Sequence, residues 1–273
     1  MAIILNGAKL GRKVLLKVRK QLKGRKLKLA VVFVGENKIS QVYLGKKKQA
    51  CEKVGVGFEV FGFSESVGVS DLKQKIKKIV QDKTNSGIVI QLPLPLNPLV
   101  TQSLLNLIPL DRDPDCLSEE SFRRFSKGKN LILPPVVGAV SKFFREYKIS
   151  LQGKTAVVVG KGRLVGLPVS IWLKQQRAKV LVCDRKTKDL AKETKKADII
   201  VSGAGSPRLI TGEMVKKGAV VIDCGTSVED GASVGDVEFV SVVKKAGYIS
   251  PVPGGVGPLA IACLLENLVN LAD

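Results

Sequence analysis

The chain has 273 residues, of which 45% are hydrophobic and 25% charged, and its formal net charge is +21 at pH 7. This length indicates two domains, each with its own core, and the lack of any run of about 18 apolar residues argues against a membrane span. Histidine is absent, which removes the commonest general base and the commonest metal ligand, so we expect no metal site.

The cysteines and the N-terminus both indicate a cytoplasmic protein. The 5 cysteines are widely spaced with no C-x-x-C pair, a pattern that fits reduced thiols better than disulfides or zinc ligands. The N-terminus has no basic segment ahead of its short apolar run and no small-residue cleavage site, unlike a secretory signal.

The excess of lysine and arginine raises the alternative of a nucleic-acid-binding protein. The lysines are spread over most of the expected helices, however, and are not interleaved with aromatic residues as in a stacking platform. Attraction of a polyanionic small substrate, or a lysine-rich surface, explains the charge as well.

Apolar β-branched runs alternate with amphipathic stretches almost throughout, which predicts βαβ units and a parallel sheet. In the first half we expect strands at residues 27–34, 57–61 and 87–92 and helices at residues 11–22, 39–54 and 70–81. Two proline-rich segments follow, at residues 92–98 and 108–115. Prolines at that density end a strand and build a loop at its carboxyl edge, where ligands bind in open α/β sheets.

A second βαβ series follows a helix expected at residues 136–147, with strands at 155–159, 179–183, 199–202 and 219–222. Between its first two strands, Gly160, Gly162 and Gly166 form a turn that would aim helix N-terminal amides at a pyrophosphate. A strand before the glycines and a helix after them is the context of a dinucleotide site. The alternative is a purely structural turn.

The end of the next strand bears on the choice of cofactor. There Asp184 would suit the ribose 2′-hydroxyl of NAD, whereas Arg185 and Lys186, with Lys161 from the glycine turn, would suit the 2′-phosphate of NADP.

Residues 251–258 (PVPGGVGP) combine three prolines and three glycines and have no polar side chain. They indicate a rigid platform of backbone N–H and C=O groups ahead of a final helix at residues 259–271, which could pack back on the first domain. The alternative is a tight strand-to-helix connection with Pro258 at the first helical position.

Tyr43 and Lys47 are four residues apart in an expected helix and therefore share a face. Like charge from Lys46 and Lys48 should favour the neutral form of Lys47 if that amine is also partly desolvated. A neutral lysine beside a phenol can transfer protons in a chain without histidine. The bare pair, however, favours the alternative of a solvated basic helix face.

Several segments occur in a recognisable order: Ser40-x-x-Tyr43-x-x-x-Lys47, Gly87-Ile-Val-Ile-Gln91-Leu-Pro-Leu-Pro95, Arg112-Asp113-Pro114-Asp115, Gly160 to Gly166-x-Pro168, Gly218 to Asp223-x-Gly225, Gly235-Asp236-Val237 and Pro251 to Pro258. Together they resemble the bifunctional methylenetetrahydrofolate dehydrogenase/methenyltetrahydrofolate cyclohydrolase family over nearly the whole chain. Cys116 stands where that family has glycine, Lys161-Gly162 where it has Arg-Ser, and Cys183-Asp184-Arg185 where it has Cys-His-Ser.

The resemblance implies an α/β homodimer with the active site in a cleft between two domains. These would be an N-terminal α/β folate-binding catalytic domain of residues 1–137 plus 252–273 and a Rossmann-like NAD(P)-binding domain of residues 138–251, with a parallel sheet. Its implied catalytic residues are Lys47, on which the second reaction depends, Gln91, which tunes that lysine, and Tyr43. Its implied substrate-binding residues are Tyr43, Gln91, Asp115, which holds the pterin, Pro253, Gly254 and Gly255. The implied cofactor-binding residues are Gly160, Lys161, Gly162, Arg163, Val165, Gly166, Arg185 and Thr226, with NADP favoured and NAD as the alternative.

The implied activity is oxidation of 5,10-methylenetetrahydrofolate to the 5,10-methenyl form, followed by hydrolysis to 10-formyltetrahydrofolate. The alternatives are a dehydrogenase without the cyclohydrolase and, from another class, a basic nucleic-acid-binding protein. If the chain is the bifunctional enzyme, its expected partners are tetrahydrofolate derivatives, including polyglutamylated ones, and a second copy of the chain. Neither nucleic acid nor membrane is an expected partner.

Overall fold

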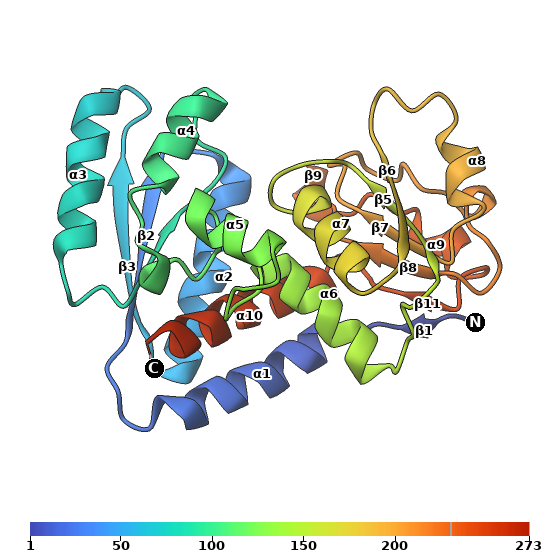
Figure 1. The fold of residues 1–273 in the computed structure, drawn as a ribbon, viewed down its shortest axis with the longest axis horizontal. Helices are drawn as coiled ribbons and strands as arrows, with labels where there is room; N and C mark the ends of the chain where they lie inside the picture. Colours follow the sequence, from blue (N-terminus) through green and yellow to red (C-terminus); the bar gives the residue numbers. More distant parts are fainter. Residues whose placement is uncertain (230, 273) are drawn as a thin grey trace. The chain divides into compact units, whose positions relative to one another are not determined.

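A computed structural model describes residues 1–229 and 231–272 and divides the chain into two compact units (Figure 1). Unit 1 comprises Met1–Gly11 and Val136–Ala260, and unit 2 comprises Arg12–Pro135 and Ile261–Asp273. This division differs from the sequence-based boundaries at residues 1–11, 136–137 and 252–260, which the sequence expectation grouped with the N-terminal domain.

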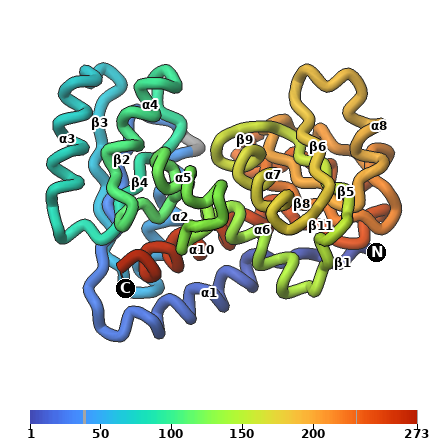
Figure 2. The backbone as a smooth tube through the Cα atoms, viewed as in Figure 1, coloured from blue at the N-terminus to red at the C-terminus, as the bar shows by residue number. Residues whose placement is uncertain are grey.

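The sheet of unit 1 is parallel and has the order β1-β11-β8-β7-β5-β6. Its strands are β1 (Ile3–Ile4), β11 (Tyr248–Ile249), β8 (Val220–Asp223), β7 (Ile199–Ser202), β5 (Thr155–Val159) and β6 (Lys179–Cys183). The strands expected at 155–159, 179–183 and 199–202 are confirmed, and β8 begins one residue later than expected. Figure 2 shows why residues 1–11 fall in unit 1, because β1 lies beside β11 at the edge of this sheet.

The strand order of unit 1 reverses at β5. The chain runs from β5 outward to β6 and then returns to β7 on the other side of β5. In an open parallel sheet the crevice at such a switch point, outside the carboxyl ends of the strands, is where ligands bind. The glycine turn predicted from the sequence follows β5 directly at this position.

Helices and short elements complete unit 1: α6 (Pro135–Glu146), α7 (Gly166–Gln175), α8 (Leu190–Thr194), η2 (Gly212–Met214), α9 (Phe239–Val242) and an antiparallel β9 (Ser227–Glu229) and β10 (Ala232–Val234). Buried Val and Ile side chains of β5, β7 and β8 form the core with Ile210 and Val242. The rings of Phe144 on α6 and Trp172 on α7 lie 6.0 Å apart. The sequence analysis did not separate α8, α9 and the β9–β10 pair, which are too short to show a period.

Unit 2 has a parallel sheet with the order β3-β2-β4, formed by β3 (Gly57–Phe63), β2 (Lys28–Val34) and β4 (Gly87–Ile90). Its helical elements are α2 (Lys38–Val54), α3 (Val69–Gln81), α4 (Pro98–Leu105), η1 (Leu110–Arg112) and α5 (Glu119–Ser126), with most of α1 (Gly7–Leu22) and of α10 (Val256–Leu271). The core joins β2 and β4 to Leu72 and Ile76 of α3 and Leu104 and Leu105 of α4.

Local signals fix the ends of α2, the helix that carries Tyr43 and Lys47. The side chain of Asn37 accepts a hydrogen bond from Ser40 N at 2.9 Å and caps the helix start. Gly55 ends the helix with φ of 87°, a left-handed conformation that glycine adopts at little cost. The sequence expectation of a helix at 39–54 is therefore confirmed to within one residue.

The last helix, α10, begins at Val256, three residues before the predicted start. The alternative that places Pro258 at the first helical position is therefore wrong in its position, because Pro258 is the third residue of α10. A proline is tolerated there because the amides of a first helical turn have no partner within the helix. Among the described residues, no helix combines the length and the hydropathy needed to cross a bilayer.

Candidate functional site

A buried lysine is the central feature of unit 2. Lys47 on α2 is only 8% exposed, and its Nζ donates a hydrogen bond to Gln91 Oε1 at 2.8 Å. Gln91 directly follows β4, and its Nε2 donates to Leu92 O at 2.9 Å. Because the amide nitrogen is used in this way, the amide oxygen faces the lysine. The structure thus brings together two of the predicted catalytic residues from separate elements.

Burial lowers the pKa of Lys47, and the nearby charges of Asp115 and Cys51 partly oppose that shift. From the sequence we expected like charge from Lys46 and Lys48 to favour the neutral form if the amine were also partly desolvated. The desolvation is confirmed and is the cause that lowers the pKa, whereas Lys46 and Lys48 are not among the causes of the shift. Both neighbours are exposed, and Lys46 Nζ lies over the ring of Tyr43, 5.5 Å from its centroid. Loss of water, rather than like charge, therefore shifts Lys47 toward its neutral form.

Tyr43 lies one turn before Lys47 on α2 and is partly buried. Ser40, a further turn back, is 2% exposed and its Oγ donates to Leu92 O at 3.4 Å. The spacing of Ser40, Tyr43 and Lys47 places them on the face of α2 directed at the end of β4. The alternative of a wholly solvated basic face is excluded for Lys47, whereas Lys46 and Lys48 do lie on an exposed face.

Asp115 lies in the loop that follows η1 and interacts electrostatically with Lys47. Burial raises the pKa of its carboxyl group, Lys47 lowers it, and Asp113 raises it. Asp113 is fully buried, and its carboxylate accepts bonds from Leu117 N at 3.2 Å and Ser118 N at 2.9 Å. A carboxyl group in such a place gains most from a ligand that offers N–H donors.

The glycine turn of unit 1 uses two of its three glycines for geometry. Gly160 has φ of 95°, and a Cβ there would lie 2.5 Å from Gly203 O. At Gly166, the first residue of α7, a Cβ would overlap the carbonyl oxygen of Gly160. Gly162 has open space around its Cα, so its role in the turn is not steric. The close approach of β5 and α7 leaves the N-terminus of α7 beside the switch point.

The end of β6 converges on this turn, as the sequence analysis expected. Lys161 Nζ lies 2.5 Å from Asp184 Oδ2, and bonding to Lys161 lowers the pKa of Asp184. Asp184 Oδ1 also accepts a bond from Lys186 N at 2.8 Å. The negative charge of Asp184 is therefore balanced by the ammonium group of Lys161 from the turn. The adjacent Arg185 is exposed. A sterically tight glycine turn, a helix N-terminus and cations at the strand end together fit a dinucleotide with a 2′-phosphate.

Two buried aspartates, Asp223 and Asp236, organise the loops after β7 and β8. In the sequence they stood out only as parts of the family motifs. Asp223 accepts bonds from Gly225 N at 2.9 Å, Asp236 N at 3.1 Å and Val237 N at 2.9 Å, and burial raises its pKa to about 6. Asp236 accepts from Ser202 Oγ and Ala204 N, both at 2.7 Å, and from Ser206 N at 2.9 Å. A glycine beside each aspartate was the available signal, because a Cβ at Gly225 or Gly235 would overlap the other carboxylate.

The remaining predicted site residues lie in unit 1. Thr226 is partly buried and follows the Asp223 loop, and Arg163 and Val165 belong to the glycine turn. Gly254 has φ of 102°, and its carbonyl accepts a bond from Ala8 N at 2.9 Å. The platform formed by Pro253, Gly254 and Gly255 thus uses part of its backbone to hold the start of α1. Within the described ranges, no three His, Cys, Asp or Glu side chains cluster as metal ligands would.

Comparison with known proteins assigns both parts of the chain. Residues 5–115 match the model of the tetrahydrofolate dehydrogenase/cyclohydrolase catalytic domain, and residues 134–273 match that of the corresponding NAD(P)-binding domain. The chain is 42% identical over 275 residues to the bifunctional protein FolD of Nautilia profundicola, covering 98% of this chain and 96% of that protein. It is 39% identical to the bifunctional protein FolD of Moorella thermoacetica, covering 99% of each.

Solved structures give the same result. The bifunctional methylenetetrahydrofolate dehydrogenase/cyclohydrolase FolD of Campylobacter jejuni superposes with a TM-score of 0.93 at 37% identity, over 100% of this chain and 99% of that one. The Trypanosoma brucei methylenetetrahydrofolate dehydrogenase-cyclohydrolase, complexed with NADP and an inhibitor, superposes with a TM-score of 0.93 at 32% identity. The match covers 99% of this chain and 97% of that one.

The glycine turn gives a direct test. Gly166→Ala should lower the free energy of unfolding by roughly 1–3 kcal/mol and weaken NADP binding, because the new Cβ must displace the Gly160 carbonyl. Gly162→Ala is the matched control for stability and should leave the free energy of unfolding near that of the parent, because a Cβ there meets no protein atom within 4 Å. Urea unfolding and calorimetric titration with NADP measure the two effects. Equal behaviour of the two variants would contradict the assignment of Gly166 as a geometric requirement.

Proposed function

Because the chain belongs to the tetrahydrofolate dehydrogenase/cyclohydrolase family, we propose that it oxidises 5,10-methylenetetrahydrofolate to 5,10-methenyltetrahydrofolate with NADP and hydrolyses this product to 10-formyltetrahydrofolate. The observation that carries the proposal is the buried Lys47 hydrogen-bonded to Gln91. It lies in the part of the chain that matches the catalytic-domain model. A dehydrogenase without the cyclohydrolase has no evident need of a desolvated amine at that place.

Oxidation depends on binding and orientation more than on proton transfer, since folate nitrogens stabilise the methenyl cation. When bound, NADP supplies the hydride acceptor. The glycine turn and the start of α7 would hold its pyrophosphate, and Arg185 with Lys161 would face its 2′-phosphate. The carboxylate of Asp115 would pair with the amino and ring N–H groups of the pterin through charge-assisted bonds.

Hydrolysis of the methenyl cation requires a group that takes a proton from water. Neutral Lys47 would accept that proton as the water oxygen bonds to the cationic carbon, and Gln91 Oε1 would orient the amine. Proton delivery to a ring nitrogen then opens the ring to the 10-formyl product, with Tyr43 on the same helix face as the second proton carrier. A permanently charged lysine would repel the bound cation, so the lowered pKa of Lys47 is part of the mechanism.

The proposal extends to partners and location. Tetrahydrofolate derivatives are the substrates, and polyglutamylated forms would suit the high positive charge. We expect a homodimer in the cytoplasm that uses neither nucleic acid nor membrane as a partner. Pro253, Gly254 and Gly255 would contact the substrate, and Thr226 the cofactor. The nucleic-acid alternative loses its support, because the family match accounts for nearly the whole chain.

Lys47→Met should abolish hydrolysis of 5,10-methenyltetrahydrofolate while retaining at least part of the hydride transfer. Only hydrolysis needs a proton-transfer group, whose contribution is typically about 10²–10⁴-fold. Lys48→Met, a change at an exposed position on the same helix, is the matched control. Absorbance assays of each half-reaction measure the split. Hydrolysis within a few-fold of the parent in Lys47→Met would reduce Lys47 to a structural residue.

Asp115→Ala should weaken substrate binding and impair both activities, because both use one pterin pocket. The lost charge-assisted bonds correspond to roughly 1.5–3 kcal/mol. The KM for methylenetetrahydrofolate and the affinity for tetrahydrofolate measure the effect, with NADP affinity as the internal reference. Unchanged folate affinity would leave Asp115 as a turn residue only.

Arg185→Ala should lower kcat/KM with NADP and leave the low value with NAD unchanged, because only NADP offers a phosphate to the guanidinium. Lys188→Ala, three residues further and also exposed, is the matched control. A parent enzyme that prefers NAD, or an Arg185→Ala variant with undiminished use of NADP, would overturn this assignment.

A further inference from the structure

A lone buried amide on α10 contacts the loop that carries Asp115. Asn267 is 5% exposed on a helix whose other residues are mostly apolar. Its Nδ2 donates to Pro114 O at 2.9 Å and to Leu133 O at 2.8 Å. A buried polar side chain on an apolar helix calls for an explanation. Here the amide ties the peptide group just before Asp115 to a second segment of unit 2.

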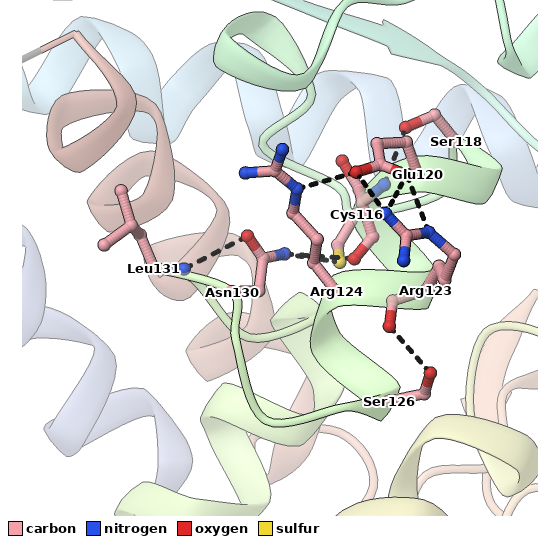
Figure 3. Close-up of polar contacts among 9 residues, drawn as sticks. Cys116, Ser118, Glu120, Arg123, Arg124, Ser126, Asn130 and Leu131 are labelled. Atoms are coloured by element: carbon pink, nitrogen blue, oxygen red, sulfur yellow. Dashed lines mark hydrogen bonds and ion pairs between the residues drawn. The ribbon is translucent and has the colours of Figure 1, made fainter.

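A second amide fixes the residue just after Asp115. Asn130 Nδ2 donates to Cys116 Sγ at 3.3 Å and to Ser121 O at 3.2 Å, and Figure 3 shows its side chain directed at the sulfur. Cys116 is fully buried with φ of 58°, a left-handed conformation that disfavours residues other than glycine. Packing and the Asn130 contact therefore hold a backbone conformation that the residue type alone would not select.

We infer that Asn267 and Asn130 are positioning residues for substrate recognition, which act by holding the loop of residues 113–116 so that the Asp115 carboxylate faces the folate. This inference rests on the proposed role of Asp115. The two amides hold the residues on either side of Asp115. Pairing of a carboxylate with planar N–H donors depends on sub-ångström placement, and small displacements cost large factors in affinity or rate.

Asn267→Leu should weaken tetrahydrofolate binding about tenfold and raise the KM for methylenetetrahydrofolate similarly, with NADP affinity within about twofold of the parent. The matched control is Asn85→Leu. Asn85 is another fully buried asparagine of unit 2 whose Nδ2 donates to a backbone carbonyl, that of Ile79, at 2.9 Å. It lies two residues before β4, whose first residue, Gly87, faces Pro114 and Leu268, so it tests whether the loss of any buried amide near this loop has the same effect. This control should lower Tm but retain folate affinity.

A double-variant cycle separates positioning from general stability. If Asn267 acts through Asp115, Asn267→Leu should cost no more than about twofold when added to Asp115→Ala. Additive losses would overturn the inference, as would parent-like folate affinity in Asn267→Leu or an equal loss in Asn85→Leu. Unchanged affinity in Asp115→Ala alone would instead refute the proposed role of Asp115, and the inference with it.

Asn130→Ala keeps the test available if Asn267→Leu does not fold. Asn130 is only partly buried and lies in a loop. The variant should weaken tetrahydrofolate binding about threefold or more without altering NADP affinity, and that loss too should vanish in the Asp115→Ala background. Folate affinity equal to that of the parent in Asn130→Ala would remove this residue from the proposal.

Discussion

Removal of one lysine amine from water is the constraint on which the catalytic part of this protein depends. A buried ammonium group is costly, so the site favours neutral Lys47, and a neutral amine is what the hydrolytic half-reaction requires. The partner of the amine, Gln91, is an amide rather than a carboxylate and so accepts a hydrogen bond without restoring a full charge. A nearby carboxyl group, that of Asp115, opposes the shift, but Asp115 is itself partly buried and its pKa is raised.

The rest of unit 2 positions these groups. Parallel pairing of β2 and β4 brings Gln91 to the carboxyl edge of the sheet, and the capped α2 presents Lys47 to it. Buried Asp113 and two asparagines, one 14 and the other 153 residues along the chain from its partner, hold the Asp115 loop. In unit 1, too, the fold places polar groups at the carboxyl edge of a parallel sheet. The expected ligand-binding edge lies where the strand order reverses at β5. There the polar groups are backbone amides, surrounded by glycines and two buried aspartates.

The periodic and local features were predictable from the sequence. Runs of Val and Ile gave β5, β6 and β7, and the spacing of Tyr43 and Lys47 gave their common helix face. The features that depend on contacts distant in the sequence were not predictable. Lys47 is buried beside Gln91, which is 44 residues away in the sequence. Asn267 bonds to Pro114, which is 153 residues away. Spacing also did not distinguish Gly162 from Gly160 and Gly166, since glycine patterns do not reveal which Cβ would meet a neighbouring backbone.

Direct titration of Lys47 tests the account most closely. In protein labelled with ¹³C at lysine Cε, the Lys47 signal is assigned by its loss in Lys47→Met and followed across pH. We expect a pKa clearly below the ordinary value of 10.5, and an increase when Gln91→Glu places a carboxylate beside the amine. A parent Lys47 that titrates near 10.5, with no response to Gln91→Glu, would contradict the claim that a desolvated neutral amine is the centre of this site.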